Sequence, residues 1–256
     1  MFDFKDLFWA LSLRDYRVRY AQTILGFAWA LIQPLFTLLI FIVVFEKAAK
    51  IETGPYPYAI FALSGLTVWS FFSYVLSQSG SSIIASQDMI KKIYFPRIII
   101  PLSKSIVGVI DFSITMFFLL LLMLYYNQPL SYSIISFPLA IILLVITSLG
   151  IGIWFSALSI RFRDFQHVIP FVVQIGLYIS PVAYPASLII DNVPNWMDFM
   201  YYLNPMAGTI DLFRYSILNS PINENYIMIS AAIALVLFST SLVYFLKTEK
   251  SMADYV

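Results

Sequence analysis

The sequence predicts an all-α membrane protein with six transmembrane helices. Hydrophobic residues make up 61% of its 256 residues, and only 11% of them carry a charge. About 20 apolar residues are needed to cross a bilayer core as a helix. Five uncharged runs are at least this long: 20–45, 53–87, 112–160, 168–190 and 225–246. The run 112–160 is too long for one helix and contains Asn127-Gln128-Pro129, a turn sequence that divides it into two.

An even number of spans places both ends of the chain on one side, and the Lys and Arg residues indicate which side is cytoplasmic. With the N-terminus inside, twelve of the 15 basic residues fall in inner segments, and only Lys47, Lys50 and Arg214 fall in outer ones. We therefore predict cytoplasmic termini. Asp3 and Asp6 argue against a signal peptide, and the chain has no cysteine, which excludes disulfides and thiol chemistry. We expect a single membrane domain, 1–256.

Residues 1–22 are predicted to form an amphipathic helix before the first span. Phe4, Leu7, Phe8 and Leu11 recur at helical spacing on one face. Such a helix either lies at headgroup depth, with Trp9 as an anchor, or docks on a partner subunit. We favour the interfacial position because the other face carries several charges.

The six spans are expected at 26–46, 56–85, 99–126, 133–160, 167–185 and 225–247. The second span carries a polar face that covers about a third of the helix circumference. Its residues are Thr67, Ser70, Tyr74, Ser77, Gln78 and Ser81. A polar face inside a bilayer turns toward other helices or toward a hydrated path. Interhelical hydrogen bonds of about 0.6 kcal/mol each are the simpler explanation. Six polar residues on one face are more than such bonds require, so we favour a hydrated path.

The first and fifth spans also contain residues that a lipid-facing helix avoids. Gln33 and Pro34 interrupt the first span, and Pro170, Gln174 and Tyr178 share one face of the fifth. A proline inside a span requires neighbours or water for the carbonyl that it leaves unbonded. These spans are therefore expected to line a cavity. Nearby aromatic rings suit sugars, although membrane proteins are rich in aromatic residues in general.

Two connecting segments are expected to form short helices. Residues 86–97 form a cytosolic helix with Ser86 as its N-cap, anchored by Ile90, Ile93 and Tyr94. Residues 186–221 are too polar to cross the membrane. They are expected to form re-entrant or surface-lying helices at the outer leaflet, with Trp196 at headgroup depth.

The sequence offers no constellation for catalysis. Enzymatic chemistry needs convergent titratable groups, whereas Asp111 is the one carboxylate inside a span and His167 is the one histidine. We interpret Asp111 as structurally paired or hydrogen-bonded. Neither a phosphate-binding glycine loop nor a metal-ligand cluster occurs, so we predict no catalytic residue, no metal site and no cofactor in this chain. An ion-coupled transporter is disfavoured because it needs several intramembrane charges.

Three stretches resemble the permease subunits of ABC-type polysaccharide exporters, most closely the Wzm-type O-antigen exporters. They are RDYRVRYAQTILGFAWALIQPL (14–35), RFRDFQHVIPFVVQIGLYISPVAYP (161–185) and NPMAGTIDLFRYSIL (204–218). The resemblance covers nearly the whole chain, in the same order and spacing.

The resemblance implies a homodimer bound to two cytosolic ATPase chains, which carry ATP and Mg. Such an exporter moves undecaprenyl-diphosphate-linked polysaccharide across the bacterial inner membrane, through a channel between the two permeases. Segment 86–97 would be the coupling helix and 186–221 the periplasmic gate. The alternative functions are a permease for another lipid, teichoic acid, capsule or drug substrate, or a membrane-embedded glycolipid transferase.

The resemblance also assigns roles to individual residues. Contact with the ATPase falls to Gln87, Asp88, Met89, Lys91 and Lys92. Channel lining falls to Trp29, Gln33, Phe36, Thr67, Ser70, Tyr74, Ser77, Ser81, Gln174 and Tyr178. Arg14, Arg17 and Arg19 would meet the lipid diphosphate, because a guanidinium binds phosphate oxygens in bidentate fashion. The positive-inside rule explains these arginines equally well.

Overall fold

The computed structural model describes residues 4–20, 26, 28–190 and 194–249, and every regular element in these ranges is helical, which confirms the predicted fold class. The predicted 1–22 helix, the 26–46 span and the outer segment extend partly beyond the described residues. In chain order the elements are α1 (Lys5–Tyr20), α2 (Ala28–Phe41) with its π-helical extension η2 (Ile42–Ala48), α3 (Tyr58–Ala85), α4 (Gln87–Lys92), α5 (Ile99–Tyr125), the 3-10 helix η3 (Tyr132–Ser136), α6 (Phe137–Arg161), α7 (Phe165–Ile179), α8 (Ser187–Ile190), α9 (Asn195–Tyr202), α10 (Pro205–Leu218) and α11 (Glu224–Glu249).

Five helical segments in the described part of the chain are long and apolar enough to cross a membrane. They are Ala28–Ala48, Tyr58–Ala85, Ile99–Tyr125, Tyr132–Arg161 and Glu224–Glu249. Each of them agrees with a predicted span to within a few residues at either end. The agreement arises because the length of an uncharged run and the turn residues that bound it are local properties of the sequence.

The fifth predicted span is wrong at its outer end. α7 has 15 residues and ends at Ile179, so it is shorter than the about 20 residues that a full crossing needs. The chain continues from Ser180 to Ala186 without forming a helix. Pro181 has no backbone N–H with which to continue the helical hydrogen bonds. In this irregular stretch the carbonyls of Pro181 and Val182 accept hydrogen bonds from the side chain of Arg214.

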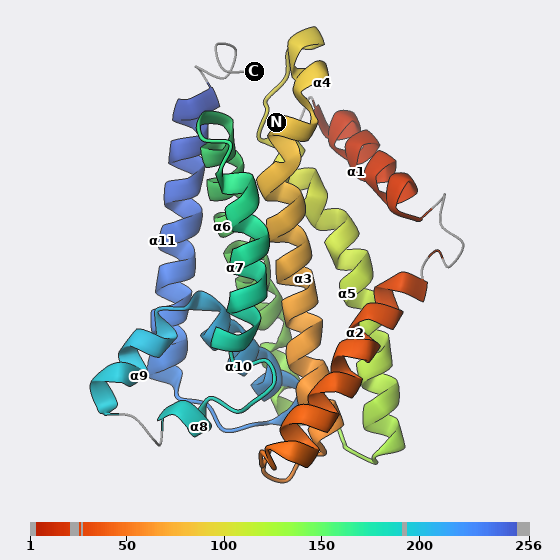
Figure 1. Ribbon diagram of the computed structural model, residues 1–256, viewed down its shortest axis with the longest axis vertical. Coiled ribbons are helices and arrows are strands. Elements are labelled where there is room, and N and C mark those ends of the chain that lie inside the picture. The colour runs from red at the N-terminus through yellow and green to blue at the C-terminus, as the bar shows by residue number, and fades with distance from the viewer. Residues whose placement is uncertain (1–3, 21–25, 27, 191–193, 250–256) are drawn as a thin grey trace.

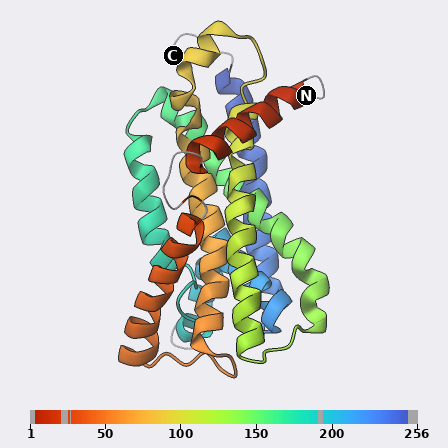
Figure 2. The ribbon, with the colours of Figure 1, turned by 90° about the vertical axis from the view of Figure 1, so that its right-hand side faces the viewer.

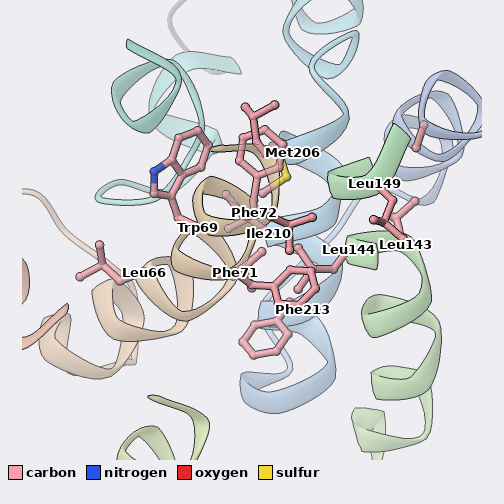
Figure 3. Close-up of a cluster of buried hydrophobic side chains, with 14 of the residues drawn as sticks. Leu66, Trp69, Phe71, Phe72, Leu143, Leu144, Leu149, Met206, Ile210 and Phe213 are labelled. Carbon is pink, nitrogen blue, oxygen red and sulfur yellow. The ribbon is translucent and has the colours of Figure 1, made fainter. Parts of the chain in front are cut away.

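The bundle is organised around α3, which packs against α5, α6, α7 and α10 and stands at the centre of Figure 1. Its aromatic residues Trp69, Phe71 and Phe72 meet Met206 and Phe213 of α10 in a cluster shared with leucines of α6 (Figure 3). Rings of this size bury large apolar areas. α3 is thus the interior helix against which the others are positioned.

α10 lies inside the bundle, which excludes the surface-lying alternative for this helix. Nearly all of its residues are buried, and it packs against α6 and α11. Asn204 caps its start by accepting a hydrogen bond from the N–H of Met206. At Gly208 an added Cβ would lie 2.5 Å from Ser230 of α11, so the two helices are in close contact.

α1 packs against the bundle of its own chain, and its expected position at headgroup depth stays a prediction. Leu11 is buried, and Phe4, Leu7 and Phe8 pack against the hydrophobic core, so the apolar face meets the protein's own bundle. Figure 2 shows α1 lying across the upper part of α5. The apolar stripe is therefore satisfied within one copy, whereas Trp9 is 60% exposed and its role as a membrane anchor stays a prediction.

α4 is shorter than the predicted helix over 86–97. Ile90 is buried as expected, whereas Ile93 and Tyr94 are 57% and 96% exposed, so these two residues do not pack against the chain's own bundle and their role as anchors stays a prediction. Phe95 is buried in their place. Ser86 stands at the N-cap position, although its hydroxyl makes no capping hydrogen bond.

α1, α4 and the last turn of α11 gather at one end of the bundle, and α8 lies at the other (Figure 1). The side chain of Glu249 accepts a hydrogen bond of 2.7 Å from the N–H of Arg97, which ties the end of α11 to the segment after α4. We refer to these as the inner and outer ends, following the charge distribution; their placement relative to a membrane stays a prediction.

Candidate transport surface

A groove that contains several polar side chains lies between the inner halves of α3 and α7. Its cavity has a volume of about 640 Å³, and the lining includes Ser77, Gln78 and Ser81 of α3 with Gln166 and Gln174 of α7. Three of the predicted lining residues, Ser77, Ser81 and Gln174, are thereby brought together. We call this cavity the α3/α7 groove. Pro170 also lines it, one turn after Gln166, whose carbonyl the proline leaves without its helical partner.

An aromatic cavity of about 280 Å³ lies farther out along α7. Trp69 and Phe72 of α3 line it, together with Phe171 and Gly176 of α7. A Cβ at Gly176 would lie 2.7 Å from the Trp69 ring, so the glycine permits the close approach of α7. Trp69 and Phe72 are nevertheless buried, whereas Phe171 is 61% exposed.

Several predicted lining residues lie on the outside of this single copy. Trp29 and Phe36 of α2 and Tyr178 of α7 are each more than half exposed, and Gln33 is also exposed. Figure 2 shows α2 and α7 on the same side of α3. Together with the α3/α7 groove and the exposed Phe171 of α7 they form one surface, which we call the α2/α7 face.

Thr67 and Tyr74 do not lie on the α2/α7 face. Thr67 is completely buried and donates a hydrogen bond to the carbonyl of Leu63 in its own helix. Tyr74 packs against Gly108 of α5, and the Arg19 guanidinium lies 4.2 Å from the centre of its ring. Ser70 is half-buried. The polar face of α3 is therefore divided between helix packing and the groove, which helical periodicity alone does not distinguish.

The basic cluster at the end of α1 is held by acidic partners. Arg19 forms a 2.6 Å ion pair with the buried carboxylate of Asp111 on α5, which also accepts a hydrogen bond from Tyr20. Lys104 of α5 forms a second ion pair with Asp15, at 2.6 Å. The structure confirms the expectation that Asp111 is structurally paired.

Sequence reasoning missed these two ion pairs between α1 and α5. Asp15 and Arg19 are four residues apart, and Lys104 and Asp111 are seven apart, so each pair shares one face of its helix. Opposite charges at these spacings, on segments of the same predicted depth, were the available signal. The pairs leave Arg14, which is bonded to Asp15, and Arg17 with exposed side chains.

α4 presents charged side chains at the inner end. Asp88, Lys91 and Lys92 are exposed, while Gln87 and Met89 are partly covered. Ile93 and Tyr94 add exposed apolar surface directly after the helix. Exposed aromatic residues such as Tyr94 are enriched in contacts between proteins.

Arg214 ties three segments together near the outer end. Its guanidinium donates to the carbonyls of Pro181, Val182 and Phe61 and to the hydroxyl of Ser64. Although the sequence placed it in an outer connection, its side chain is 1% exposed. Burial lowers the pKa of Arg214 to about 10, and the neighbouring Asp211 carboxylate opposes this shift. The group therefore stays charged at neutral pH.

Residues 6–218 match the family described as ABC-2 type transporter. The chain belongs to this family. The ABC-2 assignment and the spanning helices make the protein a multi-pass membrane protein of the transporter-permease kind.

Relatives of this ABC-2 chain match it over most of their length. The O-antigen export system permease protein RfbA of Klebsiella pneumoniae is 28% identical over 250 residues, covering 97% of this chain and 94% of the relative. The protein of the same name from Myxococcus xanthus is 25% identical over 84% of this chain and 81% of the relative. The polysialic acid transport protein KpsM of Escherichia coli is 24% identical over 90% of this chain and 92% of the relative.

Proposed function

We propose that this protein is the membrane subunit of an ATP-driven exporter that moves polysaccharide of the O-antigen type across the bacterial inner membrane. The cargo is linked to undecaprenyl diphosphate and enters from the cytosolic side. The observation that carries the proposal is similarity to O-antigen export permeases over 97% of the chain. The relative named for polysialic acid transport makes a capsule-type polysaccharide the second candidate cargo.

Two copies of the chain form the transport path in this proposal. The α2/α7 face of each copy turns toward the other, so that the α3/α7 groove and the exposed rings of Trp29, Phe36 and Tyr178 line a shared channel. Polar side chains hydrogen-bond sugar hydroxyls, and ring faces pack against sugar C–H groups. The groove's volume of about 640 Å³ within one copy supports a path that can hold sugar units.

Two separate ATPase chains supply the energy and bind ATP and Mg. The sequence contains no phosphate-binding glycine loop, which supports a nucleotide site on another chain. α4 is the proposed contact, through Asp88, Lys91 and Lys92 together with Gln87 and Met89. The exposed Ile93 and Tyr94 extend this surface with apolar area that a partner can bury.

The lipid diphosphate is proposed to meet the basic end of α1. Arg14 and Arg17 are exposed there, and arginine is suited to bidentate phosphate binding. Arg19 already bonds Asp111, so its proposed part is to position α1 against α5.

The test is export by the reconstituted complex of this chain with its ATPase in vesicles. Ser81→Leu fills the groove with an apolar side chain. It is expected to lower the rate of export of lipid-linked glycan about tenfold or more, which corresponds to a rise of about 1.4 kcal/mol in the barrier to transport. ATP hydrolysis without substrate is measured in parallel. Ser81 lies in the last turns of α3, shortly before α4, so an unchanged hydrolysis rate shows that the contact with the ATPase is intact and that the loss of export arises in the groove.

Ser81→Ala is the matched control, since it removes the hydroxyl and leaves the groove open. Export that is unaffected by Ser81→Leu would contradict the proposed path. Hydrolysis that responds to a drug and not to lipid-linked glycan would contradict the proposed cargo.

A further inference from the structure

A third cavity, separate from the α3/α7 groove and from the aromatic cavity, lies at the outer end of the bundle. Its volume is about 370 Å³, within the range of about 300 to 1,000 Å³ that is typical of small-ligand pockets. Six segments line it: 52–56 before α3, Phe61 of α3, 185–190 with α8, the end of α9, α10, and 220–226 at the start of α11. We call it the outer pocket.

The wall of the outer pocket contains a carboxylate with unused hydrogen-bonding capacity. Asp211 lines the pocket and accepts a 2.7 Å hydrogen bond from the hydroxyl of Tyr202. This is the one hydrogen bond to Asp211 in the described part of the chain, and an ionised carboxylate accepts about four. Arg214 also lines the pocket, but four hydrogen bonds to the protein occupy its guanidinium.

Two stacked tyrosines form another side of the pocket. The rings of Tyr202 and Tyr226 lie 4.9 Å apart and nearly parallel. Tyr226 donates its hydroxyl to Asp198, so both rings are fixed through hydrogen bonds to carboxylates. Such rings offer flat apolar surface in a defined orientation.

The remaining lining is rich in small polar groups and carries a further negative charge. Polar side chains are contributed by Glu52, Thr53, Ser187, Ser220 and Asn223. Glu52 and Asp211 are the two acidic groups, and the one basic group among the described lining residues is the already engaged Arg214. The two carboxylates outnumber the single guanidinium, so the pocket accepts hydrogen bonds and carries a net negative charge that disfavours anions.

We propose that the outer pocket binds a single sugar unit, either neutral or amino-substituted. A sugar hydroxyl or ammonium donates to Asp211, and the C–H face of the ring lies against the tyrosines. The rim hydroxyls bond the remaining sugar hydroxyls. That the natural ligand is a unit of the exported polysaccharide rests on the proposed function. Binding of a free sugar to the pocket can be measured without transport.

The experiment is saturation-transfer NMR on the purified full-length protein with free sugars: a neutral hexose, a hexosamine and a hexuronic acid. Ser187→Trp places an indole over the pocket from an exposed position at the start of α8, and Ser187→Ala is its matched control. We expect transfer to the hexose and the hexosamine, loss of at least most of that signal in Ser187→Trp, and full retention in Ser187→Ala. The hexuronic acid is expected to give little transfer.

Absence of transfer to every sugar, equal transfer in Ser187→Trp, or preference for the hexuronic acid would each overturn the proposal. Ser220→Phe with Ser220→Ala forms a second pair from another segment, should Ser187→Trp not fold. The groove variant Ser81→Leu separates the two proposals. If sugars bind to the protein but export is insensitive to Ser81→Leu, the proposed transport path alone is contradicted. If no sugar binds although export is normal, the outer pocket alone is contradicted.

Discussion

Arg214 is a buried charge whose hydrogen bonds decide how the chain leaves α7. Its bonds to Pro181 and Val182 satisfy carbonyls in a stretch where no helix or sheet does so. Irregular backbone at membrane depth is tolerated only where protein or water satisfies it. The ring of Phe61 also lies 3.6 Å from the guanidinium, so the same side chain joins this stretch to α3.

We predict that Arg214→Leu destabilises the protein by about 3 to 5 kcal/mol, the range for removing one partner from a buried charged network. Arg214→Lys is expected to recover part of this loss, because an ammonium keeps the charge and lacks the planar fork. Thermal unfolding in detergent measures both, with the exposed Arg17→Leu as the control. Equal unfolding temperatures for Arg214→Leu and Arg17→Leu would contradict the structural role.

α1 and α5 are joined by charge as well as by apolar packing. Asp111 is 6% exposed, and a buried carboxylate is costly unless it is paired. Arg19 supplies that pairing, and Lys104 with Asp15 supplies a second ion pair one to two turns away. Arg19 of the basic cluster therefore helps to position α1 against α5.

We predict that Arg19→Leu loosens α1, since it leaves Asp111 without its ion pair. The double variant Arg19→Leu with Asp111→Leu is expected to be less destabilised than the single variant, because it removes both charges. Amide hydrogen exchange along α1 and α5 measures the effect, with Arg17→Leu as the matched control. Equal amide exchange rates in α1 of Arg19→Leu and Arg17→Leu would contradict the role of the Arg19–Asp111 ion pair in positioning α1.

The α2/α7 face and α11 lie on different sides of the bundle. α11 forms one side of the bundle in Figure 1, and the α2/α7 face lies away from it. α7 has a single buried residue, Ile169, which is little for a helix of 15 residues. A helix covered this poorly within one copy supports the proposal that a second copy packs near it.

We predict that single cysteines on the α2/α7 face cross-link two copies in membranes. The native chain has no cysteine, so each introduced thiol reports alone. Phe36→Cys and Phe171→Cys are expected to form disulfide-linked dimers under mild oxidation, whereas Val236→Cys, at an exposed position on α11, is not. Cross-linking at Val236 and none at Phe36 or Phe171 would place the dimer contact on the opposite side.

The amino-acid sequence was sufficient for the approximate bounds of the five long helices, for the presence of short helices between them, and for the polar positions on α3 and α7. These properties depend on residues close together in the chain, namely uncharged length, helical spacing and turn chemistry. The tertiary structure decided which side of each helix is covered. It placed Thr67 in the core and Ser81 in the groove, although both lie on one polar face, and it placed Arg214 inside the bundle. Those outcomes depend on neighbours that are distant in the chain, because a side chain is buried by the helix packed against it and not by its own sequence position.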